Sequence, residues 1–126
     1  MKKELTDKLR KDFPLLYKQL RYFECDDGWY DLIRGLSAKL EPLIKQYSKT
    51  ISKDETYCQP MASQVKEKFA TLRFYMTSET QEMSDLITLY ERESSKICEC
   101  CGYPGTTINN NGWLRTLCES CKVLYL

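Results

Sequence analysis

The chain has 126 residues and a mass of 14.9 kDa, which suits a single domain. Its 19 Lys and Arg residues nearly balance 18 Asp and Glu residues, whereas a dedicated nucleic-acid-binding protein usually carries a strong basic excess. The chain has no histidine, which excludes Ser-His-Asp and Cys-His catalysis and His-ligated catalytic zinc. It also has no Gly-rich phosphate loop and no apolar run near the roughly 20 residues of a membrane span. We therefore expect a non-enzymatic protein with no membrane partner.

Two helices are expected at the start of the chain. Apolar residues recur at helical spacing through residues 3–23. Pro14 cannot continue a helix from upstream but can begin one. The sequence therefore predicts a short helix that ends near Asp12 and a second helix over residues 14–21.

The clearest periodicity follows over residues 29–47, where apolar residues form one stripe at helical spacing. Asp26 and Asp27 stand where an N-cap would be. Pro42 should bend this helix or divide it in two. The polar composition of residues 48–60 predicts a loop.

The periodicity then changes to that of strands. Apolar and polar residues alternate over 61–65 and again over 72–76. A turn within residues 66–70 would join these segments into an antiparallel hairpin. A helix over residues 63–69 is an alternative.

A further helix is expected over residues 78–97, with Ser78 or Thr80 as its N-cap. Beyond it, Asn111 and Gly112 form a dipeptide typical of two-residue hairpin turns. Short strand candidates flank that dipeptide on both sides.

Four of the seven cysteines form two Cys-x-x-Cys pairs: Cys98, Cys101, Cys118 and Cys121. Each pair can form a tight knuckle, and two knuckles complete a tetrahedral Zn²⁺ site that leaves no position open for substrate. The spacing therefore predicts a structural zinc ribbon. An iron–sulfur centre or a set of unrelated or redox-active thiols are the alternatives, and Cys100 could compete as a ligand.

The N-terminal residues 1–13 remain charged and lack the apolar stretch of a secretory signal. We therefore expect a cytoplasmic, reducing location, in which clustered cysteines serve as metal ligands rather than disulfides. Cys25 and Cys58 are most simply half-buried thiols, because the chain offers no histidine to activate them.

Four carboxylates, Glu24, Asp26, Asp27 and Asp31, form an acidic run. They could bind a divalent cation, face a basic partner or supply a catalytic carboxylate pair. Helix capping explains Asp26 and Asp27 more simply.

A basic and aromatic segment could bind single-stranded nucleic acid; its residues are Lys66, Lys68, Phe69, Arg73, Phe74 and Tyr75. The simpler interpretation is a strand with one core face and one solvated face. Trp113 and Arg115 could contact a partner, although we expect Trp113 to cover the metal site, because a small four-thiolate centre needs apolar shielding.

Taken together, the segments FPLLY, FECDDGWYDLI, QVKEKFATLRFY, CECCGYPG and GWLRTLC resemble a family of small, largely uncharacterised zinc-ribbon proteins of bacteriophages, prophages and bacteria. The resemblance runs from Phe13 to Cys121. Relatives often have histidine where Cys121 stands and glycine where Ala70 stands. The family implies no activity for particular residues, but a phage setting favours binding to a host protein, including a component of a defence system.

The sequence as a whole predicts an α+β fold. Residues 1–97 would form a helical domain with a central β-hairpin, and residues 98–126 a zinc-ribbon subdomain packed on it in one compact unit. The expected function is that of a protein-binding module that inhibits or modulates a host protein from within the host cytoplasm. The alternative is a nucleic-acid-binding or transcription-linked zinc-ribbon protein.

Overall fold

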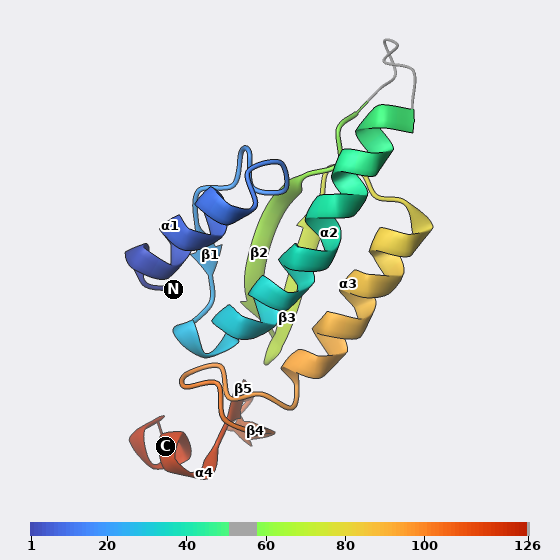
Figure 1. The fold of residues 1–126 in the computed structure, drawn as a ribbon. Coiled ribbons are helices and arrows are strands. Elements are labelled where there is room, and N and C mark those ends of the chain that lie inside the picture. Colours follow the sequence, from blue (N-terminus) through green and yellow to red (C-terminus); the bar gives the residue numbers. More distant parts are fainter. Residues whose placement is uncertain (51–57, 126) are drawn as a thin grey trace.

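The computed structural model describes residues 1–50 and 58–125, and it confirms the predicted α+β fold (Figure 1). Helices lie in the N-terminal half, a β-hairpin lies at the centre, and the cysteine-bearing segment closes the chain. The elements in chain order are α1 Lys3–Asp12, β1 Phe23–Glu24, the 3-10 turn η1 Asp27–Trp29, α2 Tyr30–Thr50, β2 Ala62–Lys68, β3 Thr71–Met76, α3 Gln81–Ser94, β4 Thr106–Asn110, β5 Trp113–Leu117 and α4 Glu119–Tyr125.

The main sheet has the strand order β1-β2-β3. β2 and β3 pair antiparallel, as predicted, and the alternative helix over residues 63–69 is wrong. β1 was not predicted; it pairs parallel to β2, with Phe23 opposite Val65. Two residues are too few to show the alternation of a strand in the sequence, so β1 is recognisable only from its pairing with β2.

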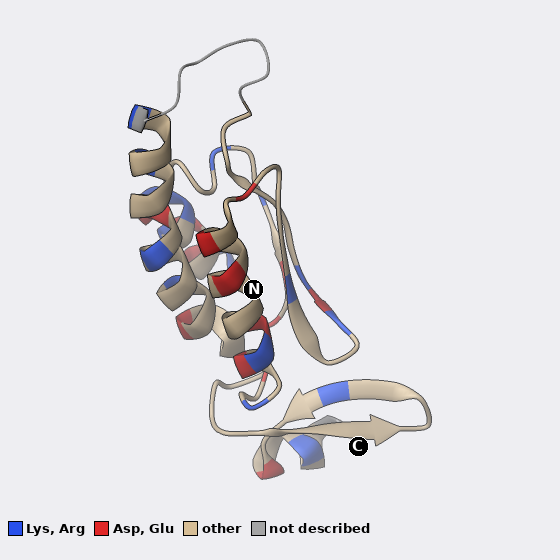
Figure 2. Ribbon diagram, turned by 90° about the vertical axis from the view of Figure 1, so that its right-hand side faces the viewer, with Lys and Arg blue, Asp and Glu red and all other residues tan. Residues whose placement is uncertain are grey.

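The helices cover one face of this sheet (Figures 1 and 2). Because strand side chains alternate between faces, every second residue of β3 points toward them, as does every second residue of β2 beyond the register shift between Ala62 and Gln64. The fully or almost fully buried side chains of this core include Val65, Leu72 and Phe74 from the sheet, Ile33, Leu36, Leu40 and Ile44 from α2, and Met83 and Ile87 from α3.

The helix predicted over residues 14–21 is wrong, since turns and bends occupy residues 14–19. The buried Glu41 carboxylate of α2 accepts hydrogen bonds from the backbone N–H groups of Leu15 (2.8 Å) and Leu16 (2.9 Å). The carbonyl of Leu16 accepts from the N–H of Ala62 at the start of β2 (2.8 Å). These hydrogen bonds to distant residues replace the backbone hydrogen bonds that a helix over residues 14–21 would make.

The structure keeps α2 unbroken from Tyr30 to Thr50, so of the two expected effects of Pro42, a bend or a division of the helix, the division is wrong. Proline removes one helical hydrogen bond, but the buried side chains of Leu40 and Ile44 hold the helix on both sides of it. The helix also extends three residues into the predicted loop, and most of the remaining loop, residues 51–57, lies outside the described residues.

Side chains of α3 close the outer edge of β3. Thr80 caps the helix, accepting from the N–H of Met83 (3.3 Å), as predicted. The N–H of Leu72 donates to Ser94 Oγ (2.8 Å), and the N–H of Phe74 donates to a carboxylate oxygen of Glu91 (2.9 Å). A sheet edge whose donors are satisfied in this way is protected from pairing with a further strand.

The β2–β3 turn consists of Phe69 (φ 52°) and Ala70 (φ 70°), both in the left-handed region. Two-residue turns of this type favour Asn and Gly at these positions. Ala70 is nevertheless buried, and its N–H donates to the Glu67 carboxylate (2.8 Å). The tight turn therefore forms although the chain has no glycine there.

We expect Phe69→Asn to raise the free energy of unfolding by about 0.5–1 kcal/mol, because a left-handed conformation costs a bulky residue roughly 1–2 kcal/mol. Phe69 is 65% exposed, so the substitution removes little packing. Urea denaturation would measure the change. Tyr22→Asn is the matched control, since Tyr22 is an exposed aromatic residue with an ordinary φ. An equal gain in both variants would contradict strain as the cause.

In the part of the chain that the structure describes, no helix is both long enough and apolar enough to cross a membrane.

Candidate metal centre

The C-terminal segment forms a two-stranded ribbon, β4–β5, followed by the short helix α4 (Figure 1). The predicted hairpin turn is confirmed: Asn111 (φ 53°) and Gly112 (φ 89°) connect the strands, and the Asn109 side chain accepts from the Gly112 N–H (2.8 Å). Helix α4 was not predicted, because its seven residues are too few for a periodic signal.

The fold brings together the four cysteines that the sequence pattern selects. The sulfur atoms of Cys98, Cys101, Cys118 and Cys121 all lie within 4.8 Å of one another, and Cys101 Sγ lies 3.6 Å from Cys118 Sγ. In a tetrahedral site with Zn–S bonds of about 2.3 Å, sulfur atoms lie roughly 3.8 Å apart. Three of the cysteines are buried and Cys101 is exposed. The geometry is that of a four-sulfur metal site at the surface.

The backbone of the first knuckle explains this convergence. The N–H of Gly102 donates to the carbonyl of Cys98 (2.9 Å), and the N–H of Cys98 donates to the carbonyl of Tyr103 (2.7 Å). Gly102 has φ 87°, which glycine adopts without strain. In the second knuckle, the N–H of Lys122 donates to the carbonyl of Cys118 (3.0 Å), which winds the chain into the first turn of α4.

The local electrostatics favour a thiolate at Cys98. Burial tends to raise the pKa of this thiol, but backbone N–H groups of three neighbouring cysteines point at its sulfur and together lower the pKa to about 7. Hydrogen bonding to Cys118 and burial raise the pKa of Cys121. A thiolate among neighbouring thiols can recruit a cation, which then displaces the remaining protons.

Hydrogen bonds on two sides join the cysteine-bearing segment to the rest of the protein. Trp29 Nε1 donates to the carbonyl of Ile97 (3.0 Å), and the N–H of Gly28 donates to the carbonyl of Glu99 (2.7 Å). On the other side, the buried Thr116 hydroxyl donates to the carbonyl of Ala70 in the β2–β3 turn (2.8 Å). The first metal knuckle and β5 therefore rest on the body of the fold.

Arg115 adds a charged contact beside the knuckle. Its guanidinium lies 2.9 Å from an Asp26 carboxylate oxygen and 3.4 Å from one of Glu99. The other Glu99 oxygen accepts from the N–H of Asp26 (3.0 Å). Burial raises the pKa of Glu99, and Arg115 partly opposes this rise. Asp26 stands at the N-cap position of η1, as predicted, but its carboxylate makes no capping bond to the described backbone and pairs with Arg115 instead.

We expect Arg115→Met to lower the free energy of unfolding by about 2 kcal/mol, because Glu99 would keep its buried charge without a counter-ion. Adding Glu99→Gln should restore part of the loss, which a double-mutant cycle would measure. The raised pKa means that the folded state binds the Glu99 proton more tightly than the unfolded state. The Glu99 contribution to stability therefore falls as the pH rises above the ordinary carboxyl range. A loss in Arg115→Met that Glu99→Gln does not relieve would contradict this assignment.

The other acidic side chains have separate partners. Glu24 accepts from the Gln64 amide (3.0 Å), and an Asp27 oxygen accepts from the N–H of Lys2 (2.7 Å). Among the described residues, the four cysteines are the group that could hold a metal ion.

Trp113 does not cover the metal site, contrary to the prediction, because its side chain is 70% exposed on β5. Leu117 is fully buried against the cysteines, with Ile108 packed on the same cluster. The shielding that the sequence analysis assigned to Trp113 therefore comes from these two aliphatic residues.

The remaining cysteines lie in three different environments. Cys25 is buried in the main core, where burial and the charge of Glu99 raise its pKa to about 12. Cys58 is exposed, and the half-buried Cys100 packs beside the metal cluster. Because a neutral, buried thiol is a poor nucleophile, Cys25 is a structural residue.

In the basic and aromatic segment, Phe74 is buried in the core, whereas Tyr75 and Phe69 are exposed and Lys66 pairs across the strands with Arg73. The predicted strand with one core face and one solvated face is therefore confirmed.

The fold as a whole places four sulfur ligands around one point and anchors them through backbone hydrogen bonds. Thiolate donors suit Zn²⁺ and iron among the common metals. Comparison of the chain with protein-family models, with curated proteins and with solved structures finds no significant match.

Proposed function

We propose that this protein is a zinc-stabilised protein-interaction module without catalytic activity. Four thiolates fill a tetrahedral site completely and leave no position for water or substrate, which suits structural rather than catalytic zinc. The sulfur separation of 3.6 Å between Cys101 and Cys118 is close to the tetrahedral value, which supports a single ion.

The observation that carries the interaction proposal is the exposure of large apolar side chains on the ribbon and α4. Val123 and Leu124 are 82% and 78% exposed, and Tyr103 and Trp113 are each 70% exposed. Apolar residues of this size at the surface of a small, rigid unit are typical of protein contact sites. The metal would hold this surface in one shape.

For the partner we propose a host protein, in the host cytoplasm. This part of the proposal draws on the resemblance to phage and prophage proteins. A reducing compartment also suits a centre built from thiolates, because disulfides would consume its ligands.

Metal analysis of the purified protein tests the first part of the proposal. We expect one zinc ion per chain and no visible absorption band. Stoichiometric iron with a visible band would instead indicate an iron–sulfur centre and overturn the zinc assignment.

Affinity capture from nuclease-treated host lysate tests the second part. Tagged wild-type protein should retain one stoichiometric host protein, and Val123→Ser/Leu124→Ser should lose it while keeping its zinc. Leu89→Ser is the matched control, since Leu89 is an exposed apolar residue of α3 outside the ribbon. Equal capture by all three proteins would place the contact elsewhere and contradict the proposed surface.

A further inference from the structure

The face of the β1-β2-β3 sheet that is turned away from the helices is open. Figure 2 shows α2 and α3 on one side of the β2–β3 hairpin, and no helix or strand of the described residues lies against its other side. The alternation of β2 and β3 sends Val65 and Phe74 into the core, so the neighbouring residues Lys66 and Arg73 point to the open face. The proposed protein-contact surface on the ribbon and α4 does not include this open face.

The open face carries an excess of positive charge. Lys66 and Arg73 are direct cross-strand partners, an arrangement that destabilises a sheet when both residues have the same charge. Among the described residues, neither of them nor Lys68 has an acidic group within salt-bridge distance, although Arg73 is near enough to Glu91 of α3 to lower the pKa of that carboxyl against the rise caused by burial. The nearest strand neighbour of opposite charge, Glu24, instead accepts from Gln64 (3.0 Å). An anionic ligand would relieve this repulsion.

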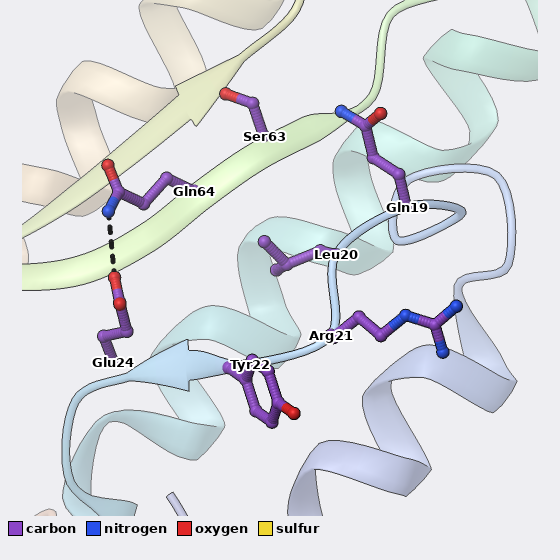
Figure 3. A pocket seen from close by; sticks show the side chains of 7 residues that line it. All are labelled: Gln19, Leu20, Arg21, Tyr22, Glu24, Ser63 and Gln64. Atoms are coloured by element: carbon purple, nitrogen blue, oxygen red, sulfur yellow. Dashed lines mark hydrogen bonds between the residues drawn. The ribbon is translucent and has the colours of Figure 1, made fainter.

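A groove of about 540 Å³ lies beside these cations, between β2 and the segment that leads into β1 (Figure 3). Its volume is within the range of small-ligand sites, roughly 300–1,000 Å³. The lining residues are Gln19, Leu20, Arg21, Tyr22, Glu24, Ser63 and Gln64. The groove therefore combines an aromatic ring, a guanidinium and two side-chain amides, which can donate and accept hydrogen bonds at the edge of a base.

Aromatic side chains extend from the groove along the same face. Tyr22 is 78% exposed at the rim of the groove. Tyr22 directly precedes Phe23, the partner of Val65, so the parallel register extended by one residue places Tyr22 beside Gln64. Gln64 lies opposite the exposed Tyr75, so the two tyrosines are about two strand spacings, or about 10 Å, apart. At the far end, Lys68 Nζ lies 5.6 Å from the ring of the exposed Phe69. Exposed rings interleaved with cations are the combination on which unpaired bases stack.

We propose that this face binds single-stranded nucleic acid, with one base in the groove against Tyr22 and the phosphates along Lys66, Lys68 and Arg73. A single strand fits better than a duplex, because its unstacked bases are free to enter a groove and stack on exposed rings. This activity goes beyond the proposed function, and it uses a different surface from Val123 and Leu124.

Fluorescence anisotropy with a labelled oligothymidylate of about 12 nucleotides tests the proposal. Tyr22→Ser should weaken binding roughly five- to hundredfold, the usual effect of losing one stacking ring, without changing its salt dependence. Lys66→Gln and Lys68→Gln should each weaken binding and lower the slope of log K against log salt by about 0.7. Thermal unfolding of each variant would show that the fold is retained.

Two matched controls separate this face from the rest of the surface. Tyr103→Ser removes an exposed aromatic residue of the ribbon, and Lys45→Gln removes an exposed lysine of α2. Neither substitution should change the oligonucleotide affinity by more than about twofold. The loss of a direct contact worth about 1 kcal/mol would weaken binding by more than that.

Three results would overturn the proposal. The first is no binding at low salt with protein concentrations up to about 100 µM, the weak end of non-specific affinity. The second is binding that Tyr22→Ser and Lys66→Gln leave unchanged. The third is loss of a captured host protein in Lys66→Gln, which would assign the open face to a protein partner. Loss of capture in Val123→Ser/Leu124→Ser alone bears on the proposed function and leaves this inference intact.

Discussion

Replacing Cys118 by serine should remove the metal and unfold the β4–β5 ribbon. Cys118 Sγ lies 3.6 Å from Cys101 Sγ in the centre of the cluster, and a serine hydroxyl is a poor replacement for a thiolate ligand. Structural zinc contributes an apparent 10–16 kcal/mol, roughly, to small zinc domains at neutral pH. Leu117 is the one large apolar side chain in the described ribbon that is fully buried, so packing alone would not hold this segment. We expect zinc content to fall to background and the variant to lose solubility, while amide exchange in β4 and β5 rises strongly.

Two cysteine variants serve as controls for this prediction. Cys58→Ser changes an exposed thiol far along the chain from the cluster, and Cys100→Ser changes the extra cysteine inside the first knuckle. Both should keep one zinc ion per chain. Zinc loss in Cys100→Ser would show that Cys100 has replaced one of the four proposed ligands. A Cys118→Ser protein that is metal-free yet as protected as the wild type would refute the structural role of the metal.

Gly28→Ala should separate the ribbon from the body of the protein. A Cβ atom at Gly28 would lie 2.2 Å from the carbonyl oxygen of Cys98 and 2.4 Å from that of Glu99. Both contacts are with backbone atoms, which cannot move aside as a side chain can, and the 2.7 Å hydrogen bond from Gly28 to Glu99 would break. We expect a loss of at least about 3 kcal/mol in the free energy of unfolding. Zinc should also pass more rapidly to a chelator, because Cys98 belongs to the displaced knuckle.

Gly35→Ala is the matched control for this substitution. Gly35 lies within α2, and its Cβ atom would meet the flexible Tyr90 side chain at 3.3 Å. Alanine favours a helix over glycine by about 1 kcal/mol, which offsets the tight contact. Stability should therefore change little. If both variants unfold at the same urea concentration as the wild type, the close packing of the ribbon on Gly28 is not a stabilising contact.

The periodic elements of this protein are visible in its sequence. The apolar stripe of α2, the strand alternation of β2 and β3 and the Thr80 cap of α3 all depend on residues close together in the chain. The same is true of the Asn-Gly turn between β4 and β5. Local patterns of this kind report which face of an element is buried, and they predicted these elements correctly.

The cysteine ligand pattern is also a local signal, because each knuckle is made by two cysteines separated by two residues. The spacing selected the same four cysteines whose sulfur atoms converge in the fold. What the sequence alone determined is therefore the α+β class and the composition of the candidate metal centre.

Only the tertiary structure decided how these parts meet. The segment at residues 14–19 is not a helix, because Glu41, more than 20 residues away, takes its backbone N–H groups. Arg115 pairs with Asp26 across 89 positions of sequence, and Gly28 is required by a backbone that belongs to the metal knuckle. The open sheet face also exists only once the helices have covered the opposite side. Such features arise from contacts between distant segments, whose free energy depends on three-dimensional proximity and leaves no periodic trace along the chain.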